Sequence, residues 1–303
     1  EGGFLNNRVS IDMDVYLEKT HALLSSLELP YSNGFDSYTE NIGAVENKGF
    51  ELKASVWMLR DTERRFLWSV TGNLAYNKDK ITKLSEAMKA ANEKLASIGG
   101  SNPNRILREG DSQNAIYAVP SLGIDPSSGE EIYLKKNGEV TKLWSAADRV
   151  NCGISNPKYR GNLSTMVRYK DLSLNMSFGF NWGGQKYNQT LIDRVENADK
   201  RYNVDERVFK DRWQNPGDKT FFKGVNVTTS SNYSSRFVQD ENVLSLSALN
   251  LSYDFNPAWL RKIYLKTLRL EASTNELFRL STIKQERGTS YPFARTVNFS
   301  LRA

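Results

Sequence analysis

Apolar and polar residues alternate with a period of two along eight segments of the chain. The alternation is most regular between 172 and 184, where one set of positions holds Leu172, Leu174, Met176, Phe178, Phe180 and Trp182. A helix would mix the two sets, because its side chains repeat every 3.6 residues, so this period predicts β-strands. The eight predicted strands are 9–18, 50–58, 66–77, 159–170, 172–184, 243–255, 262–278 and 296–303.

The phase of the alternation slips once, within the sixth predicted strand. Leu244 and Leu246 are even-numbered, whereas Leu249 and Leu251 are odd-numbered. One extra residue in a strand returns both sets to the same face of a sheet. The sequence therefore predicts a β-bulge near Ser247-Ala248.

The connections between the predicted strands alternate between long and short. Long connections cover 25–41, 80–158, 185–240 and 279–291, and short ones cover 61–64, 170–171 and 256–261. Antiparallel barrels of outer membranes place short turns at one end and long loops at the other. A soluble β-sandwich has no reason for this sorting, although it stays the alternative. We therefore predict an all-β fold, an antiparallel transmembrane β-barrel wall with long extracellular loops.

Two of the long connections are large insertions, at about 80–158 and 185–240. Apolar residues from Ile81 to Leu95 recur at steps of three and four, which predicts an amphipathic helix over 81–97. Short helices are expected near 189–197 and 203–213, and glycine and proline punctuate most of the rest.

Composition excludes several classes of protein. The mean hydropathy is −0.56, and no stretch approaches the roughly 20 apolar residues that a membrane helix needs. A barrel remains compatible, because only every second strand residue faces lipid. The net charge is +6, yet no run of Lys and Arg or RNA-binding motif is present, so we expect no nucleic-acid partner.

The residue types that carry catalysis or bind metals are few. His21 and Cys152 are the single histidine and cysteine, which leaves no histidine cluster or cysteine-based zinc site. Asp12 and Asp14 share the polar face of the first strand, so we interpret them as lining a wet lumen. Glu130 and Glu131 form the other carboxylate pair, and no metal, cofactor or catalytic residue is expected.

Aromatic residues in the long connections are the main candidates for contact with a substrate or a partner protein. Large flat rings stack on sugars and also pack well at protein interfaces. The alternative is that they form small cores that hold the loops together. The candidates are Tyr31, Phe35, Tyr38, Tyr117, Tyr133, Trp144, Tyr187, Trp213 and Tyr233.

Several longer motifs occur in a fixed order along the chain. They are NIGAVENKGFEL at 41–52, WSVTGNLAYNK at 68–78, REG at 108–110, NPKYRG at 156–161, RWQNPGD at 212–218, NLSY at 250–253, RLEASTN at 269–275 and YPFART at 291–296. In this order they resemble the late barrel strands of TonB-dependent receptors, and most closely the SusC/RagA family of Bacteroidota outer membranes. Such barrels generally end in an aromatic residue, whereas this chain ends Leu301-Arg302-Ala303.

The resemblance implies a location in the bacterial outer membrane and a plugged, 22-stranded barrel that imports nutrients. Residues 1–303 would form about eight C-terminal strands of that one barrel domain, with the plug domain outside this chain. The implied partners are a SusD-like surface lipoprotein, TonB acting through the N-terminal region, outer-membrane lipid, and an oligosaccharide or peptide substrate.

Three functional hypotheses follow. The first is a nutrient importer without enzymatic activity. The second is a barrel of the same type that acts as a scaffold in a multiprotein outer-membrane assembly. The third is a free-standing eight-stranded barrel, for which insertions of this size are excessive.

Overall fold

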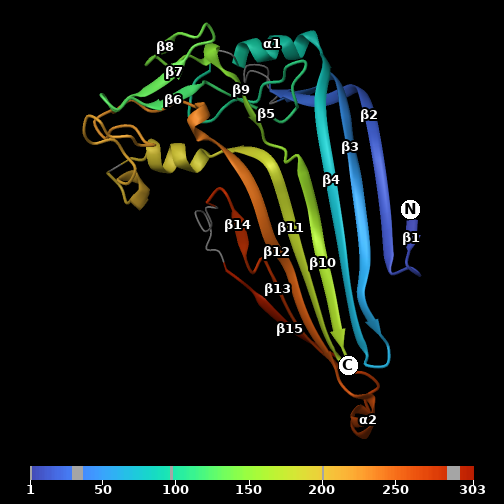
Figure 1. Ribbon diagram of the computed structural model, residues 1–303. Coiled ribbons are helices and arrows are strands. Elements are labelled where there is room, and N and C mark those ends of the chain that lie inside the picture. Colours follow the sequence, from blue (N-terminus) through green and yellow to red (C-terminus); the bar gives the residue numbers. More distant parts are fainter. Residues whose placement is uncertain (1, 29–36, 96–97, 200, 285–293) are drawn as a thin grey trace.

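The computed structural model describes residues 2–28, 37–95, 98–199, 201–284 and 294–303. Its main feature is one curved antiparallel sheet, in the order β1-β2-β3-β4-β10-β11-β12-β13-β15, with β14 also paired to β12 (Figure 1). The strands are β1 (Gly2–Phe4), β2 (Val9–Glu28), β3 (Ser37–Asp61), β4 (Phe66–Leu84), β10 (Tyr159–Tyr169), β11 (Leu172–Tyr187), β12 (Val238–Asp254), β13 (Arg269–Asn275), β14 (Arg279–Ser281) and β15 (Val297–Arg302). Consecutive long strands pair with each other, as the sequence pattern predicts.

Long and short connections lie at opposite ends of this sheet (Figure 1). Tight turns join β3 to β4 and β10 to β11, at the end where the chain terminates. The insertions between β4 and β10 and between β11 and β12 lie at the other end. The predicted sorting is confirmed for these two turns and two insertions. The insertions are slightly shorter than expected, because β4 extends to Leu84, β11 extends to Tyr187 and β12 begins at Val238.

The two insertions carry short elements of their own, which we call the loop layer (85–158 and 188–237). The first insertion holds α1 (Glu86–Leu95), β5 (Ala115–Ala118), β6 (Ser121–Ile124), β7 (Glu131–Leu134), β8 (Val140–Thr141), η2 (Ala146–Asp148) and β9 (Val150–Ile154). The second holds η3 (Leu191–Glu196), η4 (Glu206–Val208) and η5 (Ser235–Phe237). No helix within the described part of the chain is long and apolar enough to cross a membrane.

The boundaries of several predicted elements are wrong. The strand expected over 9–18 continues to Glu28 and the strand expected over 50–58 begins at Ser37, so strand residues occupy much of the connection expected over 25–41. The helix expected over 81–97 begins only at Glu86, because β4 continues to Leu84. Ile81 and Leu84 still pack with Met88 in one apolar cluster. Thr82 has no partner in the register, and this irregularity gives the end of the strand the three-residue spacing of a helix.

The strand expected over 262–278 begins at Arg269. Pro257 opens α2 (Pro257–Leu260), whose N-cap Asn256 accepts a hydrogen bond from the amide of Ala258, and η6 (Arg261–Ile263) continues the helical turn. Tyr264 then adopts a left-handed conformation, with φ of 59°, which ends the helix before the strand begins.

The predicted bulge in β12 is confirmed. Ser177 pairs with Ala248 and Phe178 pairs with Leu246, so Ser247 has no partner in the register. Its hydroxyl donates to the carbonyl of Ser177 at 2.9 Å. The extra residue brings the even-numbered and odd-numbered leucines of β12 to one face of the sheet.

Candidate functional site

The outer face of the sheet is apolar and open to its surroundings. Among its residues, Val15 is 73% exposed, Phe299 75% and Leu301 65%. Monomeric soluble proteins rarely leave so many large apolar side chains on one continuous face. The face therefore suits lipid and not water.

Two rows of large, mostly aromatic side chains border this apolar face, and we call them the aromatic rows. The row nearer the loop layer crosses five paired strands through Val15, Phe50, Tyr76, Tyr159 and Trp182. Neighbouring rings in it lie 5.7 Å apart between Phe50 and Tyr76, and 5.2 Å apart between Tyr76 and Tyr159. The row nearer the tight turns contains Phe66, Tyr169, Leu172 and Tyr253.

The spacing of the two rows matches the thickness of a membrane. On β10, Tyr159 belongs to one row and Tyr169 to the other, ten residues along the strand. At about 3.3 Å per residue and a tilt of about 40°, ten residues span roughly 25 Å along the membrane normal. That is about the height of the apolar band between the aromatic girdles of outer-membrane barrels.

The inner face of the same strands is polar. One register row crosses it through Asp12, Lys53, Asn73, Asn162 and Gly179. Residues from six strands line an open groove of about 670 Å³ on this face. Asp12 and Asp14 lie in it, which agrees with their interpretation as residues of a wet lumen.

The two insertions pack into one body at the loop-layer end of the sheet. Ala118, Val119 and Tyr133 from the first insertion form a buried cluster with Tyr233 from the second. Val119 pairs with Ser234 in a parallel bridge, and its carbonyl accepts from the amide of Ser235 at 2.8 Å. The loop layer is therefore held by contacts between segments about a hundred residues apart in the sequence.

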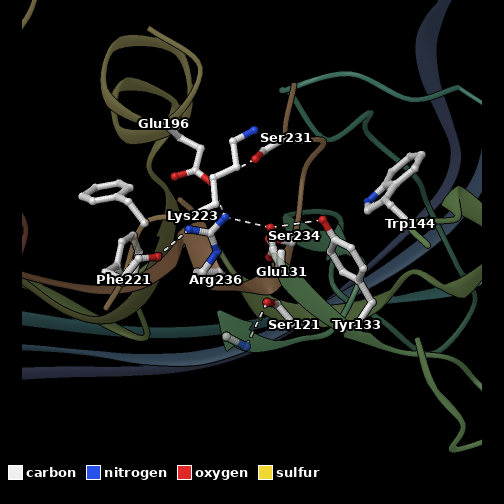
Figure 2. A network of polar contacts seen from close by, with 12 residues as sticks. Ser121, Glu131, Tyr133, Trp144, Glu196, Phe221, Lys223, Ser231, Ser234 and Arg236 are labelled. Carbon is white, nitrogen blue, oxygen red and sulfur yellow. Dashed lines mark hydrogen bonds and ion pairs between the residues drawn. The ribbon is translucent and has the colours of Figure 1, made fainter. Parts of the chain in front are cut away.

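A buried ionic network lies at the centre of that body (Figure 2). The guanidinium of Arg236 donates to Glu131 and to Glu196, both at 2.7 Å, and to the carbonyl of Phe221 at 2.6 Å. The side chains of the three charged residues are 4%, 3% and 0% exposed, respectively. Glu131 comes from the first insertion, whereas Glu196 and Arg236 come from the second, so the network ties the insertions together.

Hydroxyl groups donate further hydrogen bonds to the two carboxylates (Figure 2). Ser234 and Tyr133 donate to Glu131 at 2.7 Å and 3.1 Å, and Ser231 donates to Glu196 at 2.9 Å. One oxygen of Glu196 is buried without a hydrogen-bond partner among the described residues. Buried ion pairs are stable only with such additional hydrogen bonds, because removing the charges from water is costly.

Burial and charge shift the pKa values in this network. Burial alone would raise the pKa of Glu131, but the adjacent guanidinium of Arg236 and the donated hydrogen bonds outweigh it and lower that pKa. Burial raises the pKa of Tyr133, and the Glu131 carboxylate raises it further. Burial lowers the pKa of Lys223, which the nearby Glu196 partly offsets. The charges serve to bind the two loops to each other, and no nucleophile or general base with free access to solvent emerges from them.

The aromatic residues of the loop layer pack mainly inside it. Four of them are less than 9% exposed, namely Tyr117, Tyr133, Trp213 and Tyr233. Side chains that are so buried have little surface to offer a ligand. Their polar atoms are used internally. Tyr117 donates to Asp111, Trp213 donates to the carbonyl of Pro126 at 2.9 Å, and Tyr233 donates to the carbonyl of Ile98 at 3.1 Å.

Trp144 and Tyr187 are partly buried against the same cluster. The indole of Trp144 donates to the carbonyl of Tyr233 at 2.9 Å, and the hydroxyl of Tyr187 donates to the carbonyl of Ser101 at 2.8 Å. This geometry favours the alternative interpretation, in which the rings hold the loops together, and contact with a substrate or partner stays a prediction.

The remaining aromatic candidates belong to the first long connection. Tyr31 and Phe35 lie outside the described residues. The backbone of Tyr38 pairs with Leu27 at the beginning of β3.

The other candidate residues have ordinary surroundings. Burial raises the pKa of the Cys152 thiol, which makes it a poorer nucleophile. Glu130 is exposed and pairs with Lys142 at 2.9 Å, apart from the buried Glu131. Among the described residues no group of His, Cys, Asp and Glu could hold a metal ion.

Sequence reasoning missed the buried arginines. Arg236 stands in a polar loop, and its partner Glu131 lies 105 residues earlier. Arg212 is also buried and donates to the carbonyls of Val208 and Val195, at 2.6 Å and 2.7 Å. No local pattern distinguishes these arginines from exposed ones, so their burial could not be predicted from the sequence.

Comparison with known proteins agrees with this architecture. A family model described as "TonB dependent receptor-like, beta-barrel" matches residues 1–273. TonB-dependent receptor P39 of Formosa agariphila is 25% identical over 89% of this chain and 30% of its own length. TonB-dependent receptor SusC of Bacteroides thetaiotaomicron is 23% identical over 86% of this chain and 26% of its own length. The chain thus spans less than a third of these relatives.

A solved structure of the RagAB peptide transporter has the same fold. Its TM-score is 0.75, with 21% sequence identity over 93% of this chain and 31% of that one. A second RagAB structure, in the "open-open" state, gives a TM-score of 0.72. The family consists of outer-membrane receptors and transporters and not of enzymes. Because the family model matches most of the chain, this protein belongs to the TonB-dependent receptor β-barrel family of the outer membrane.

Proposed function

We propose that these strands form part of the wall of a larger plugged barrel that imports nutrients across the outer membrane. One observation carries the proposal: the sheet has an apolar outer face bordered by two aromatic rows and an inner face that is polar over the same height. A wall of this kind separates lipid from an aqueous path. The similarity to SusC and to the RagAB peptide transporter supports import of an oligosaccharide or a peptide.

The proposal includes partners on both sides of the membrane. A SusD-like surface lipoprotein would cover the loop layer, and TonB would supply energy through segments outside this chain. The loop layer suits a protein partner because Leu122, Val140 and Leu143 on and beside the β6-β7-β8 sheet are 57%, 57% and 79% exposed.

Uptake measured in whole cells tests the proposal. Deleting the gene for the receptor should abolish uptake of its nutrient and growth on it, and the wild-type gene should restore both. Dissipating the proton gradient should stop uptake in the restored strain, because TonB draws on that gradient. Uptake that persists in the deletion strain would contradict the proposal.

A scaffold in an outer-membrane assembly is the second candidate, and the exposed apolar residues of the loop layer favour it as well. Purification from the native membrane distinguishes the two. A scaffold should co-purify with assembly proteins and leave nutrient uptake unchanged when deleted.

A further inference from the structure

The groove on the inner face contains an unusual set of charges. Among the residues that line it are Asp12, Asp14, Glu51, Lys53 and Arg160. Glu51 follows Phe50 in the chain and Arg160 follows Tyr159, and both of those aromatic residues belong to the row nearer the loop layer. The groove therefore lies level with the row nearer the loop layer.

Two of these charges compensate each other in the register of the sheet. Asp12 lies directly opposite Lys53 on the neighbouring strand. Side chains in such positions have Cβ atoms about 5 Å apart, so opposite charges there are favourable. This pair needs no ligand.

The other three charges have no opposite charge directly across from them in the register. Asp14 lies directly opposite Glu51, and two like charges in that arrangement destabilise a sheet. Arg160 lies between Ala75 and Asn181, which carry no charge. None of the three side chains makes a hydrogen bond or ion pair with another residue of the described ranges.

We propose that this groove binds the two ends of a short peptide. The peptide ammonium lies between the carboxylates of Asp14 and Glu51, and the terminal carboxylate meets the guanidinium of Arg160. The positive end of the ligand relieves the repulsion between the two acids, and the planar guanidinium matches a carboxylate with two parallel hydrogen bonds. This inference rests on the proposed import function and selects the peptide between its two substrate classes.

The dimensions of the groove set the length of the peptide. Adjacent strands are about 4.8 Å apart, so the backbone of Arg160 is roughly 10 Å from that of Glu51 and roughly 14 Å from that of Asp14. An extended chain advances about 3.3–3.6 Å per residue. Peptides of three or four residues therefore fit.

Other ligand classes match these charges less well. A neutral oligosaccharide offers only hydroxyl groups and leaves the repulsion between Asp14 and Glu51 in place. A polyanionic glycan suits Arg160 but is repelled by the two acids. A zwitterion alone satisfies both ends of the groove.

The test is a binding experiment with the full-length receptor in lipid nanodiscs. The probes are a pool of tetrapeptides with free ends, the same pool N-acetylated, the same pool C-amidated, and maltotetraose, with retained ligand measured by mass spectrometry. Losing one charge-assisted contact typically weakens binding by about tenfold or more. We expect the free-ended pool to be retained about tenfold better than either blocked pool.

Substitutions assign each end of the peptide to its residues. Glu51→Gln together with Asp14→Asn should remove the preference for a free ammonium and keep the preference for a free carboxylate. Arg160→Gln should do the reverse, and Arg160→Lys should retain most of the carboxylate preference. Because each variant keeps one preference, it also reports that the receptor is folded. Glu18→Gln is the matched control, since Glu18 has the same inner-facing parity on β2 outside the groove.

Several outcomes would overturn the inference. Equal retention of free and blocked peptides is one, and maltotetraose binding that ignores all substitutions is another. A third is a lower unfolding temperature of the ligand-free Asp14/Glu51 variant with unchanged peptide selectivity, since the acids would then hold another part of the receptor. If the groove fails but deletion still abolishes nutrient uptake, only this inference falls and the import function stands.

Discussion

Replacing Arg236 by methionine tests whether the ionic network holds the loop layer together. Methionine fills much of the space of the arginine but carries no charge. The substitution leaves Glu131 and Glu196 buried without the guanidinium that both share. It also removes the donor to the carbonyl of Phe221 and the contact with the ring of Phe237, whose centroid is 4.5 Å from the guanidinium carbon.

The expected effect is large and local. Removing one partner of a buried ion pair destabilises a structure by about 3–5 kcal/mol, and here one arginine serves two carboxylates. Local opening of the loop layer should therefore become about a hundred- to several-thousand-fold more frequent. The strands of the wall should be unaffected, because none of the three charged side chains belongs to it.

Hydrogen exchange of the full receptor measures this opening segment by segment. Amides in β7 and in η3 to η5 should lose protection in the Arg236→Met variant, while β10 and β11 keep theirs. Arg201→Met is the matched control, since Arg201 is 83% exposed and, within the described ranges, forms its ion pair locally with Asp199. Exchange unchanged from the wild type would refute the idea that the network secures the loops.

A triple substitution separates the effect of charge from that of packing. Glu131→Leu, Glu196→Leu and Arg236→Met together remove all three charges and keep similar volumes. Replacing a whole buried ionic group by apolar residues is often neutral or stabilising. The triple variant should therefore be better protected than Arg236→Met alone. A triple variant that exchanges faster still would show that packing, and not uncompensated charge, governs the loss.

Three further predictions concern pH, the membrane face and a close contact in the sheet. The pKa of Glu131 is lowered below its ordinary value of 4.5, so the ionised carboxylate contributes fully to stability above pH 4.5, and this contribution is lost as the pH falls through the lowered pKa. The tryptophan fluorescence of the loop layer should change in that pH range, and Glu131→Gln should flatten the change. Met176→Arg places a charge midway between the aromatic rows of β11 and should cost about 2–4 kcal/mol of stability in the membrane, whereas Asn175→Arg, on the polar face, should change the urea midpoint little. Gly161→Ala places a methyl group 2.2 Å from the carbonyl oxygen of Asn73 and 2.5 Å from the ring of Phe180, which should lower the free energy of unfolding by about 1–3 kcal/mol. In the control Gly72→Ala, the added methyl group meets nothing nearer than 3.6 Å. Equal urea midpoints for the two variants would contradict the argument.

The wall of the protein could be predicted from the sequence because its pattern is local. Each strand buries or exposes every second residue, so a single strand contains its own signal. The bulge at Ser247 could be predicted for the same reason, since one extra residue shifts the phase of the strand that contains it. The end of β4 could not be predicted because its period of two is broken there. Ile81 and Leu84 are three residues apart, which is the spacing of a helix, but Thr82 has no partner in the register and both side chains are buried in one cluster.

The loop layer could not be predicted in this way, because its contacts join residues far apart in the sequence. Glu131 and Glu130 are neighbours of the same type, yet one is buried against Arg236 and the other is exposed beside Lys142. Nothing local distinguishes them. The aromatic residues of the insertions are likewise ambiguous in the sequence, since a ring suits a ligand surface and a small core equally well.

The two aromatic rows lie between these extremes, because the sequence contains them but only the register reveals them. Phe66 and Tyr76 are ten residues apart on β4, and so are Tyr159 and Tyr169 on β10. Antiparallel pairing places Tyr159 beside Tyr76 and Tyr169 beside Phe66. A shift of the register by two residues would keep every side chain on its face but would separate the rings of each row. The register observed is therefore the one that aligns both aromatic rows across neighbouring strands, as a barrel wall with level boundaries at the two lipid interfaces requires.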